Sequence, residues 1–170
     1  MATLPYTYEQ VKKALGNQVI TPWHDANDNE YTSSSKQSVT GGTTYDFEDN
    51  GLAYEVMNFP SHITRMWDKT NNKIVVDEFQ DSPAIVARVR FMFEPTSSAA
   101  GTIDVTIEPD NVSPEFSNTI TVPFKSEATQ VEGLFTFYVG TQAAANGLVI
   151  KYSPSLGGKV WDRRIWIYRT

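Results

Sequence analysis

The feature that most constrains this chain is a two-residue alternation of apolar and polar side chains, which begins near Thr43 and recurs to the end. In its longest run Arg88 and Arg90 stand between apolar positions, which are Ile85, Ala87, Val89, Phe91 and Phe93. Ile103, Val105 and Ile107 repeat the pattern. Because successive side chains of a strand point to opposite faces, this period predicts sheets buried on one face and wet on the other. We therefore expect a scaffold or binding surface with Phe91 in its core.

Strands are expected throughout residues 43–170. Their ranges are 43–48, 52–58, 62–67, 73–80, 84–93, 102–108, 119–124, 131–139, 147–152 and 160–168. Asp49-Asn50-Gly51 and Asn146-Gly147 supply turn residues between them. Pro123 interrupts one run, so that strand is expected at an edge or with a bulge. The spacing predicts an all-β, antiparallel β-sandwich, with a jelly roll as the first choice.

The first forty-two residues differ from this pattern and are expected to form an N-terminal arm. Thr7 and Gln10 have the spacing of a capping box. Tyr8, Val11 and Leu15 then recur at helical spacing, which predicts one short amphipathic helix. Such a helix is too short to be stable alone, so its apolar stripe must dock on the body or on a neighbouring subunit. The rest of residues 1–42 is polar and lacks periodicity.

Charge and composition exclude several classes of partner. The net charge is −6, and residues 1–80 carry six Lys or Arg against eleven Asp or Glu. Because nucleic-acid binding needs a basic footprint, no nucleic acid is expected. No apolar stretch is long enough for a membrane span, and the chain has no cysteine for a disulfide or thiolate. Residues 159–170 are locally basic and are expected to meet an acidic protein surface, including another copy of the chain.

One acidic loop has part of the spacing of a calcium site. Asp25, Asn27 and Asn29 occupy alternate positions, but Glu30 and Lys36 stand where the loop requires Gly and Glu. The EF-hand interpretation therefore fails, and no metal or other cofactor is expected. A looser site made by Asp25, Asp28 and Glu30 remains the alternative to a solvated loop.

Catalytic patterns are equally incomplete. His24 and His62 are the two histidines, and neither has a neighbouring nucleophile in a recognisable motif. Asp46 and Glu48 would share a strand face about 7 Å apart, a separation that inverting glycosidases use. A charged edge strand that resists aggregation explains the same pair more simply. We expect that the chain is not an enzyme.

Arginine and tryptophan near the chain end are the strongest candidates for an interface. Trp161 and Trp166 differ in parity, so they are expected on opposite faces of one strand. Trp and Arg are enriched where interfaces carry their energy. The candidate interface residues are Tyr8, Val11, Leu15, Trp161, Arg163, Arg164, Trp166 and Arg169. The alternative is that Trp161, Ile165 and Ile167 fill the core while the arginines are solvated. For Arg88 and Arg90, cross-strand pairs with Asp104 and Glu108 of the next strand are expected.

The last third of the chain resembles small virion proteins of tailed bacteriophages. The segments that carry the resemblance are 134–141, 145–147, 149–151 and 160–165, a Phe-Tyr-Val-Gly strand, an Asn-Gly turn and a closing Asp-Arg strand. The resemblance implies a capsid decoration (cement) protein, or else a head-fibre or tail component. It further implies a homotrimer that is made in the host cytoplasm and binds the major capsid protein on the capsid surface. A carbohydrate-binding module or a receptor-binding tip is the alternative, since exposed tryptophans can stack on sugars.

Overall fold

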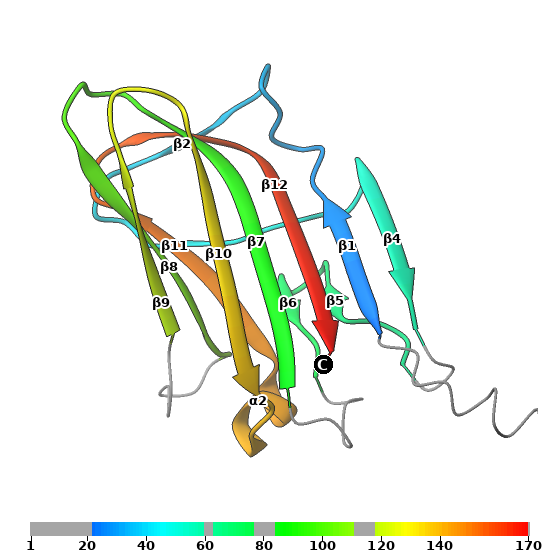
Figure 1. The fold of residues 1–170 in the computed structure, drawn as a ribbon. Helices are drawn as coiled ribbons and strands as arrows, with labels where there is room; N and C mark the ends of the chain where they lie inside the picture. The colour runs from blue at the N-terminus through cyan, green and yellow to red at the C-terminus, as the bar shows by residue number, and fades with distance from the viewer. Residues whose placement is uncertain (1–21, 60–62, 77–83, 111–117, 170) are drawn as a thin grey trace, which may run out of the picture.

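Two antiparallel sheets pack face to face in the computed structural model, which describes residues 22–59, 63–76, 84–110 and 118–169 (Figure 1). Sheet A has the strand order β10-β7-β12-β1-β4, with β2 also paired to β12. Sheet B has the order β5-β6-β11-β8-β9, with β3 also paired to β11. The all-β sandwich predicted from the period-two pattern is confirmed.

The strands of sheet A are β1 (Trp23–Asn27), β2 (Gln37–Val39), β4 (Tyr54–Asn58), β7 (Ala84–Pro95), β10 (Thr129–Tyr138) and β12 (Gly158–Arg169). The strands of sheet B are β3 (Tyr45–Asp46), β5 (Trp67–Asp68), β6 (Lys73–Ile74), β8 (Gly101–Pro109), β9 (Asn118–Phe124) and β11 (Leu148–Pro154). One short helix, α2 (Thr141–Asn146), joins β10 to β11.

The chain passes back and forth between the sheets. From β7 it crosses to sheet B for β8 and β9, returns for β10, crosses again for β11 and ends in sheet A with β12. The resulting orders, β10-β7-β12-β1 facing β9-β8-β11-β3, are those of a jelly roll. Strand β9, which contains Pro123, lies at one end of sheet B, as its proline predicts.

The core consists of the inward-facing apolar side chains of both sheets. Phe91 is fully buried, as predicted, and its ring lies 5.0 Å from Tyr152 and 6.3 Å from Phe47 between centroids. Four other apolar residues of the alternating runs are also fully buried: Val89, Phe93, Ile103 and Val105. Aromatic rings from both sheets therefore meet at the centre of the sandwich.

The sandwich begins earlier in the sequence than the boundary at residue 42. Strand β1 lies inside sheet A, paired with β12 on one side and with β4 on the other (Figure 1). Its inward positions hold His24 and Ala26, so it lacks the apolar alternation that marks the other strands. The predicted short helix, with Tyr8, Val11 and Leu15, lies outside the described residues.

Two further features differ from the sequence predictions, namely the length of two strands and the presence of a helix. The strands expected at 62–67 and 73–80 are represented in the described residues by the two-residue strands β5 and β6. Helix α2 was not expected at all, although Gly147, with φ 78°, ends it in the predicted turn. In the described part of the chain, no helix has both the length and the apolar character required to cross a membrane.

Candidate functional site

A β-bulge near the start of β12 decides which side chains reach the outer face of sheet A. Trp161 lies opposite Met92 of β7, and the register resumes with Arg164 opposite Arg90. Three steps on β12 therefore match two on β7, and Asp162 has the left-handed φ of 56° that such a bulge can require. The extra residue reverses the parity of everything after it. Trp161 and Trp166 lie on the same, outer face, so the prediction that they point to opposite faces is wrong.

The outer face of sheet A carries a cluster that we call the arginine–aromatic face. Its members are Trp23, Asp25, Tyr54, Arg88, Arg90, Glu132, Arg164, Trp166 and Tyr168. The strands place them in rows: Arg88 and Asp25 flank Trp166, while Arg90 lies beside Arg164 one pair further along. The five successive strands β10, β7, β12, β1 and β4 therefore contribute to one continuous surface.

Trp166 is the centre of this face, because three guanidinium groups surround its ring. The guanidinium carbon of Arg164 lies 4.1 Å from the ring centroid, that of Arg88 4.8 Å and that of Arg90 5.6 Å. Such cation–π contacts are each worth about 0.5–1 kcal/mol at exposed sites. A sugar ring would have to stack on a face of the Trp166 indole. The arginine guanidinium groups already lie over this ring and would compete with the sugar.

Carboxylates hold two of these arginines with paired hydrogen bonds. Arg164 donates to both oxygens of Asp25 at 2.8 and 2.6 Å, and Arg88 donates to both oxygens of Glu132 at 2.9 Å. The hydrogen bond from Arg88 lowers the pKa of Glu132, while Asp25 raises the pKa of Arg164. Bidentate pairs fix the plane of the guanidinium as well as its position. The face is consequently organised before any partner arrives.

The expected partners of Arg88 and Arg90 were wrong. Strand β8, which holds Asp104 and Glu108, belongs to sheet B, and β7 pairs instead with β10 and β12. The connection from β7 to β8 crosses between the sheets, whereas the expectation assumed a hairpin within one sheet. Arg88 pairs instead with Glu132 of β10, and Arg90 lies 3.6 Å from Oδ2 of Asp162 in β12.

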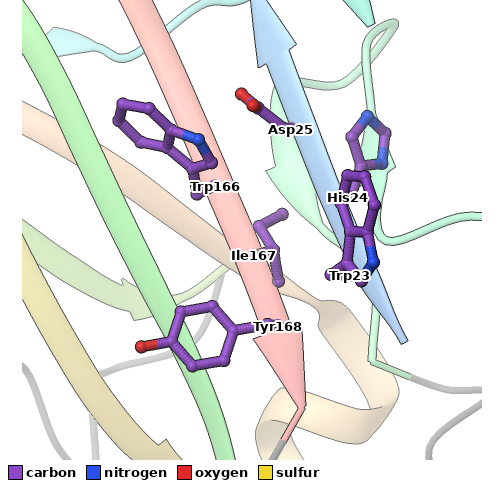
Figure 2. A pocket seen from close by; sticks show the side chains of 6 residues that line it. All are labelled: Trp23, His24, Asp25, Trp166, Ile167 and Tyr168. Atoms are coloured by element: carbon purple, nitrogen blue, oxygen red, sulfur yellow. The ribbon is translucent and has the colours of Figure 1, made fainter. Parts of the chain in front are cut away.

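An open cavity of about 380 Å³ adjoins the arginine–aromatic face at the ends of β1 and β12. In Figure 2 the side chains of Trp166 and Tyr168 project from β12, and those of Trp23 and Asp25 project from β1. The residues that line it are Trp23, His24, Asp25, Trp166, Ile167 and Tyr168. Its walls are mostly aromatic or aliphatic, and Arg164 already occupies both oxygens of Asp25. This chemistry fits an apolar side chain better than a hydroxyl-rich ligand.

The outer face of sheet B has a different character. Thr121 donates to Asp104 at 2.7 Å, and the hydroxyls of Thr106 and Thr119 lie 2.8 Å apart. Lys151 forms an ion pair with Glu108. These short polar and charged side chains are typical of a solvated surface.

A buried ion pair lies beneath the bulge. Arg163 is fully buried and donates through Nε and Nη2 to Oδ2 of Asp28 at 3.1 and 2.8 Å. Its Nη1 lies 3.4 Å from Glu48, and its guanidinium carbon lies 4.5 Å from the ring centroid of Tyr31. Arg163 is thus a structural cation that its own chain neutralises.

Asp49 lies near this pair and is also fully buried. Its Oδ1 accepts a hydrogen bond of 2.8 Å from the Gly51 amide, whereas Oδ2 has no hydrogen-bond partner among the described residues. Burial raises the pKa of Asp49 to about 7, and the negative charge of Asp28 adds to the rise. Arg163 and Lys69 act in the opposite direction.

The other candidate interface residues have different surroundings. Trp161 is 8% exposed, with the Lys36 ammonium 4.1 Å from its ring centroid. Arg164 and Trp166 are half-buried on the arginine–aromatic face, and Arg169 is half-buried at the end of β12. Tyr54 and Tyr168 also belong to this face and were not singled out from the sequence, and Trp23, a tryptophan considered there for sugar stacking, was not among the candidate interface residues. The spacing of two residues between Trp166 and Tyr168 indicates in the sequence that they share a face. Which face this is follows only from the bulge that precedes them.

The residues weighed for catalysis or metal binding do not gather. His24 is buried, with Nε2 3.0 Å from Oε1 of Glu55, and burial lowers its pKa. Asp46 is exposed on sheet B, whereas Glu48 turns toward Arg163. Asp25 and Asp28 bind different arginines. Across the described ranges, no three His, Cys, Asp or Glu side chains are arranged to hold a metal ion. His62 lies outside them.

Comparisons with known proteins concern the fold. No protein-family model and no curated protein matches the chain. Among solved structures, Eiger TNF from S. frugiperda is similar at 8% identity with a TM-score of 0.51, over 88% of this chain and 91% of the other. PRD1 vertex protein P5 is similar at 9% identity with a TM-score of 0.47, over 88% of this chain and 73% of the other. The first likeness shows a shared β-sandwich architecture, and the second is too weak to support an inference.

Proposed function

We propose that this chain is a non-enzymatic virion structural protein, a capsid decoration protein that binds the exterior of a phage capsid and associates with further copies of itself. The observation that carries the proposal is the contrast between the two outer faces of the sandwich. Sheet B presents threonines and a lysine–glutamate ion pair, whereas sheet A presents tryptophan and tyrosine around a cavity, with arginines beside them.

The chemistry of the arginine–aromatic face favours a protein partner. Trp, Tyr and Arg are the residues that most often dominate the binding energy of protein interfaces. The bidentate pairs of Arg88 and Arg164 limit the side-chain entropy that docking would cost. The open cavity beside Trp166 can receive an apolar anchor from the partner. A rigid scaffold with one such face has what attachment to a capsid requires, without any catalytic group.

The choice of a capsid as the partner rests on the resemblance of the last third of the chain to tailed-phage virion proteins. Two of its segments fall in β10 and β12, which flank β7 in sheet A. The major capsid protein is the proposed partner, and the capsid surface is the proposed location.

Co-sedimentation with capsids tests this proposal. The capsids are assembled from the major capsid protein encoded in the same genome, and the variants are Trp166→Ala and, as a matched control, Lys151→Ala on the outer face of sheet B. Loss of a central aromatic anchor should weaken capsid binding by about thirtyfold, the equivalent of 2 kcal/mol. The control should bind as the wild type does. Equal binding by both variants, at unchanged thermal stability, excludes this face as the capsid contact.

A carbohydrate-binding module or receptor-binding tip is the second candidate, favoured by the three aromatic side chains around one cavity: Trp23, Trp166 and Tyr168. The guanidinium groups around Trp166 and the apolar walls make it the weaker candidate. Titration with glycans from the host cell surface, followed by tryptophan fluorescence, decides between them. A saturable change that Trp23→Ala abolishes would support glycan binding.

A further inference from the structure

Strand β4 is an open edge of sheet A. It pairs with β1 along one side, and no described strand pairs with its other side (Figure 1). An open edge presents a row of unpaired backbone amides and carbonyls to any strand that can align with it. Proteins usually protect such edges with charged residues, prolines or very short strands.

The side chains of β4 offer little of this protection. Tyr54, Val56 and Met57 are 46%, 37% and 45% exposed. Tyr54, a member of the arginine–aromatic face, points outward, as does Val56, whereas Met57 projects to the other side of the sheet and lies opposite His24 of β1. The strand therefore exposes apolar side chains on both of its faces, in addition to its unpaired edge.

The charge on β4 does not guard the edge. Glu55 forms ion pairs with His24, at 3.0 Å, and with Lys69. The Glu55 side chain is 20% exposed and lies on the inward side of the strand, opposite Ala26, so it neither projects along the edge nor carries uncompensated charge.

The other long edge strands differ. Strand β9 contains Pro123 and alternates with exposed threonines, which gives the edge of sheet B a polar and interrupted character. Strand β10 closes the sandwich against β9, since these two strands are in contact across the sheets. The unguarded edge in the described residues is thus β4.

We propose that β4 is a self-association surface, at which two copies of the chain pair β4 with β4 antiparallel about a twofold axis and join their A sheets. The strand is complementary to itself in this arrangement. With Val56 on the axis, Tyr54 faces Asn58 of the second copy and Glu55 faces Met57, so like charges are not brought opposite each other. A twofold contact of this kind uses the same patch on both copies.

This inference goes beyond the proposed function, because the pairing of β4 requires no capsid. It is also a different contact from the threefold one that the phage resemblance implies, and it can coexist with that contact by joining two trimers. The pairing would place two arginine–aromatic faces side by side on one continuous sheet, which doubles the valency of the capsid-binding surface.

Single cysteines test the pairing in the purified full-length chain, since the natural sequence contains none. At the axis, Val56→Cys places two sulfurs on directly opposed residues, whose Cα atoms are about 4.5–5.5 Å apart and suit a disulfide. Oxidation should link this variant into dimers at least about tenfold faster than Thr121→Cys on the exposed edge strand β9, because only the former is held within disulfide reach.

A second pair of variants fixes the register. Tyr54→Cys is about 13 Å from its own counterpart in the proposed ladder, so it should not link to itself. Mixed with Asn58→Cys, it should give a linked heterodimer. If Val56→Cys fails to link, or if Tyr54→Cys links to itself as readily, the proposal is overturned. If residues 1–21 of the same chain cover this edge instead, Val56→Cys will not link, and this outcome also overturns the pairing of β4 with β4.

Mass measurement provides a test that needs no oxidation. Val56→Lys puts two like charges face to face on the axis and should weaken self-association by about tenfold or more, whereas Thr121→Lys should not change it. Unchanged association in Val56→Lys refutes the pairing. Because no capsid is present, a negative result here leaves the capsid proposal standing, and a failure of capsid binding leaves this one standing.

Discussion

The buried carboxylate of Asp49 makes the stability of this protein depend on pH in an unusual direction. Asp49 is fully buried with one unpartnered oxygen, and its pKa rises from 3.8 to about 7. Between these values the folded chain keeps a proton that the unfolded chain has released. The free energy of unfolding that depends on Asp49 therefore falls as the pH increases, and the loss is complete above about pH 7.

The size of the effect follows from the shift. Each pKa unit corresponds to about 1.4 kcal/mol, so the full shift destabilises the ionised folded state by about 4 kcal/mol. Between pH 5 and pH 8, Asp49 should lower the free energy of unfolding by about 2–3 kcal/mol. Asp49→Asn removes this dependence and keeps an oxygen that can accept the hydrogen bond from Gly51.

Urea denaturation at several pH values measures the prediction. The difference in unfolding free energy between Asp49→Asn and the wild type should grow in favour of the variant by about 2–3 kcal/mol from pH 5 to pH 8. Comparing the two chains cancels the pH dependence of unfolding that comes from His24 and from the carboxylates other than Asp49. Glu127→Gln removes an exposed carboxylate and serves as the control, with a curve parallel to the wild type. Parallel curves for Asp49→Asn as well would refute the reasoning.

Three further predictions concern the core, the buried ion pair and metal. Phe91→Ala should lower the free energy of unfolding by about 3–5 kcal/mol in urea titrations, because it opens a cavity between the sheets, and a loss below about 1 kcal/mol would contradict its position. Arg163→Met should cost about 3–5 kcal/mol by leaving the charge of Asp28 buried without its cation, and adding Asp28→Asn, which removes that charge but can still accept a hydrogen bond from the amide of Glu30 or Tyr31, should recover part of that loss. Millimolar calcium should leave the thermal midpoint unchanged, since Asp25 and Asp28 are bound to arginines, and a chelator-reversible rise would show a site.

The sequence predicted the parts of the fold in which burial alternates without interruption. In β7 and β8 each inward residue is apolar, so the period-two pattern identifies both strand and face. In β1 the inward positions are His24 and Ala26, and the outward ones include Trp23 and Asp25. Hydrophobic periodicity therefore could not detect β1, because this strand lacks apolar alternation of its own and is buried by its neighbours β12 and β4.

The candidate site was harder to predict, because the bulge in β12 adds one residue and so exchanges the inward and outward positions of the rest of the strand. Arg164 and Trp166 were named as candidate interface residues and lie on one face of the sheet, whereas Arg163 was grouped with them and is buried. The bulge at Asp162 separates these positions, and its left-handed φ leaves no strong mark in a sequence that has no glycine there. Arg88 and Arg90 join the face only through the pairing of β7 with β12, which strand patterns alone do not specify.

The place of β12 in sheet A has a consequence for how the protein folds. Trp23 of β1 pairs with Tyr168, so among the described strands β1 and β4 connect to the rest of sheet A only through β12, which is made much later in synthesis. Closing so long a loop is slow, and topologies dominated by distant contacts fold on the slower part of the range. Until β12 is synthesised, β1 and β4 form an unsupported two-stranded ribbon with two open edges. A ribosome-bound chain would therefore be most exposed to misassociation just before the end of this segment emerges, and slower translation there would prolong that interval.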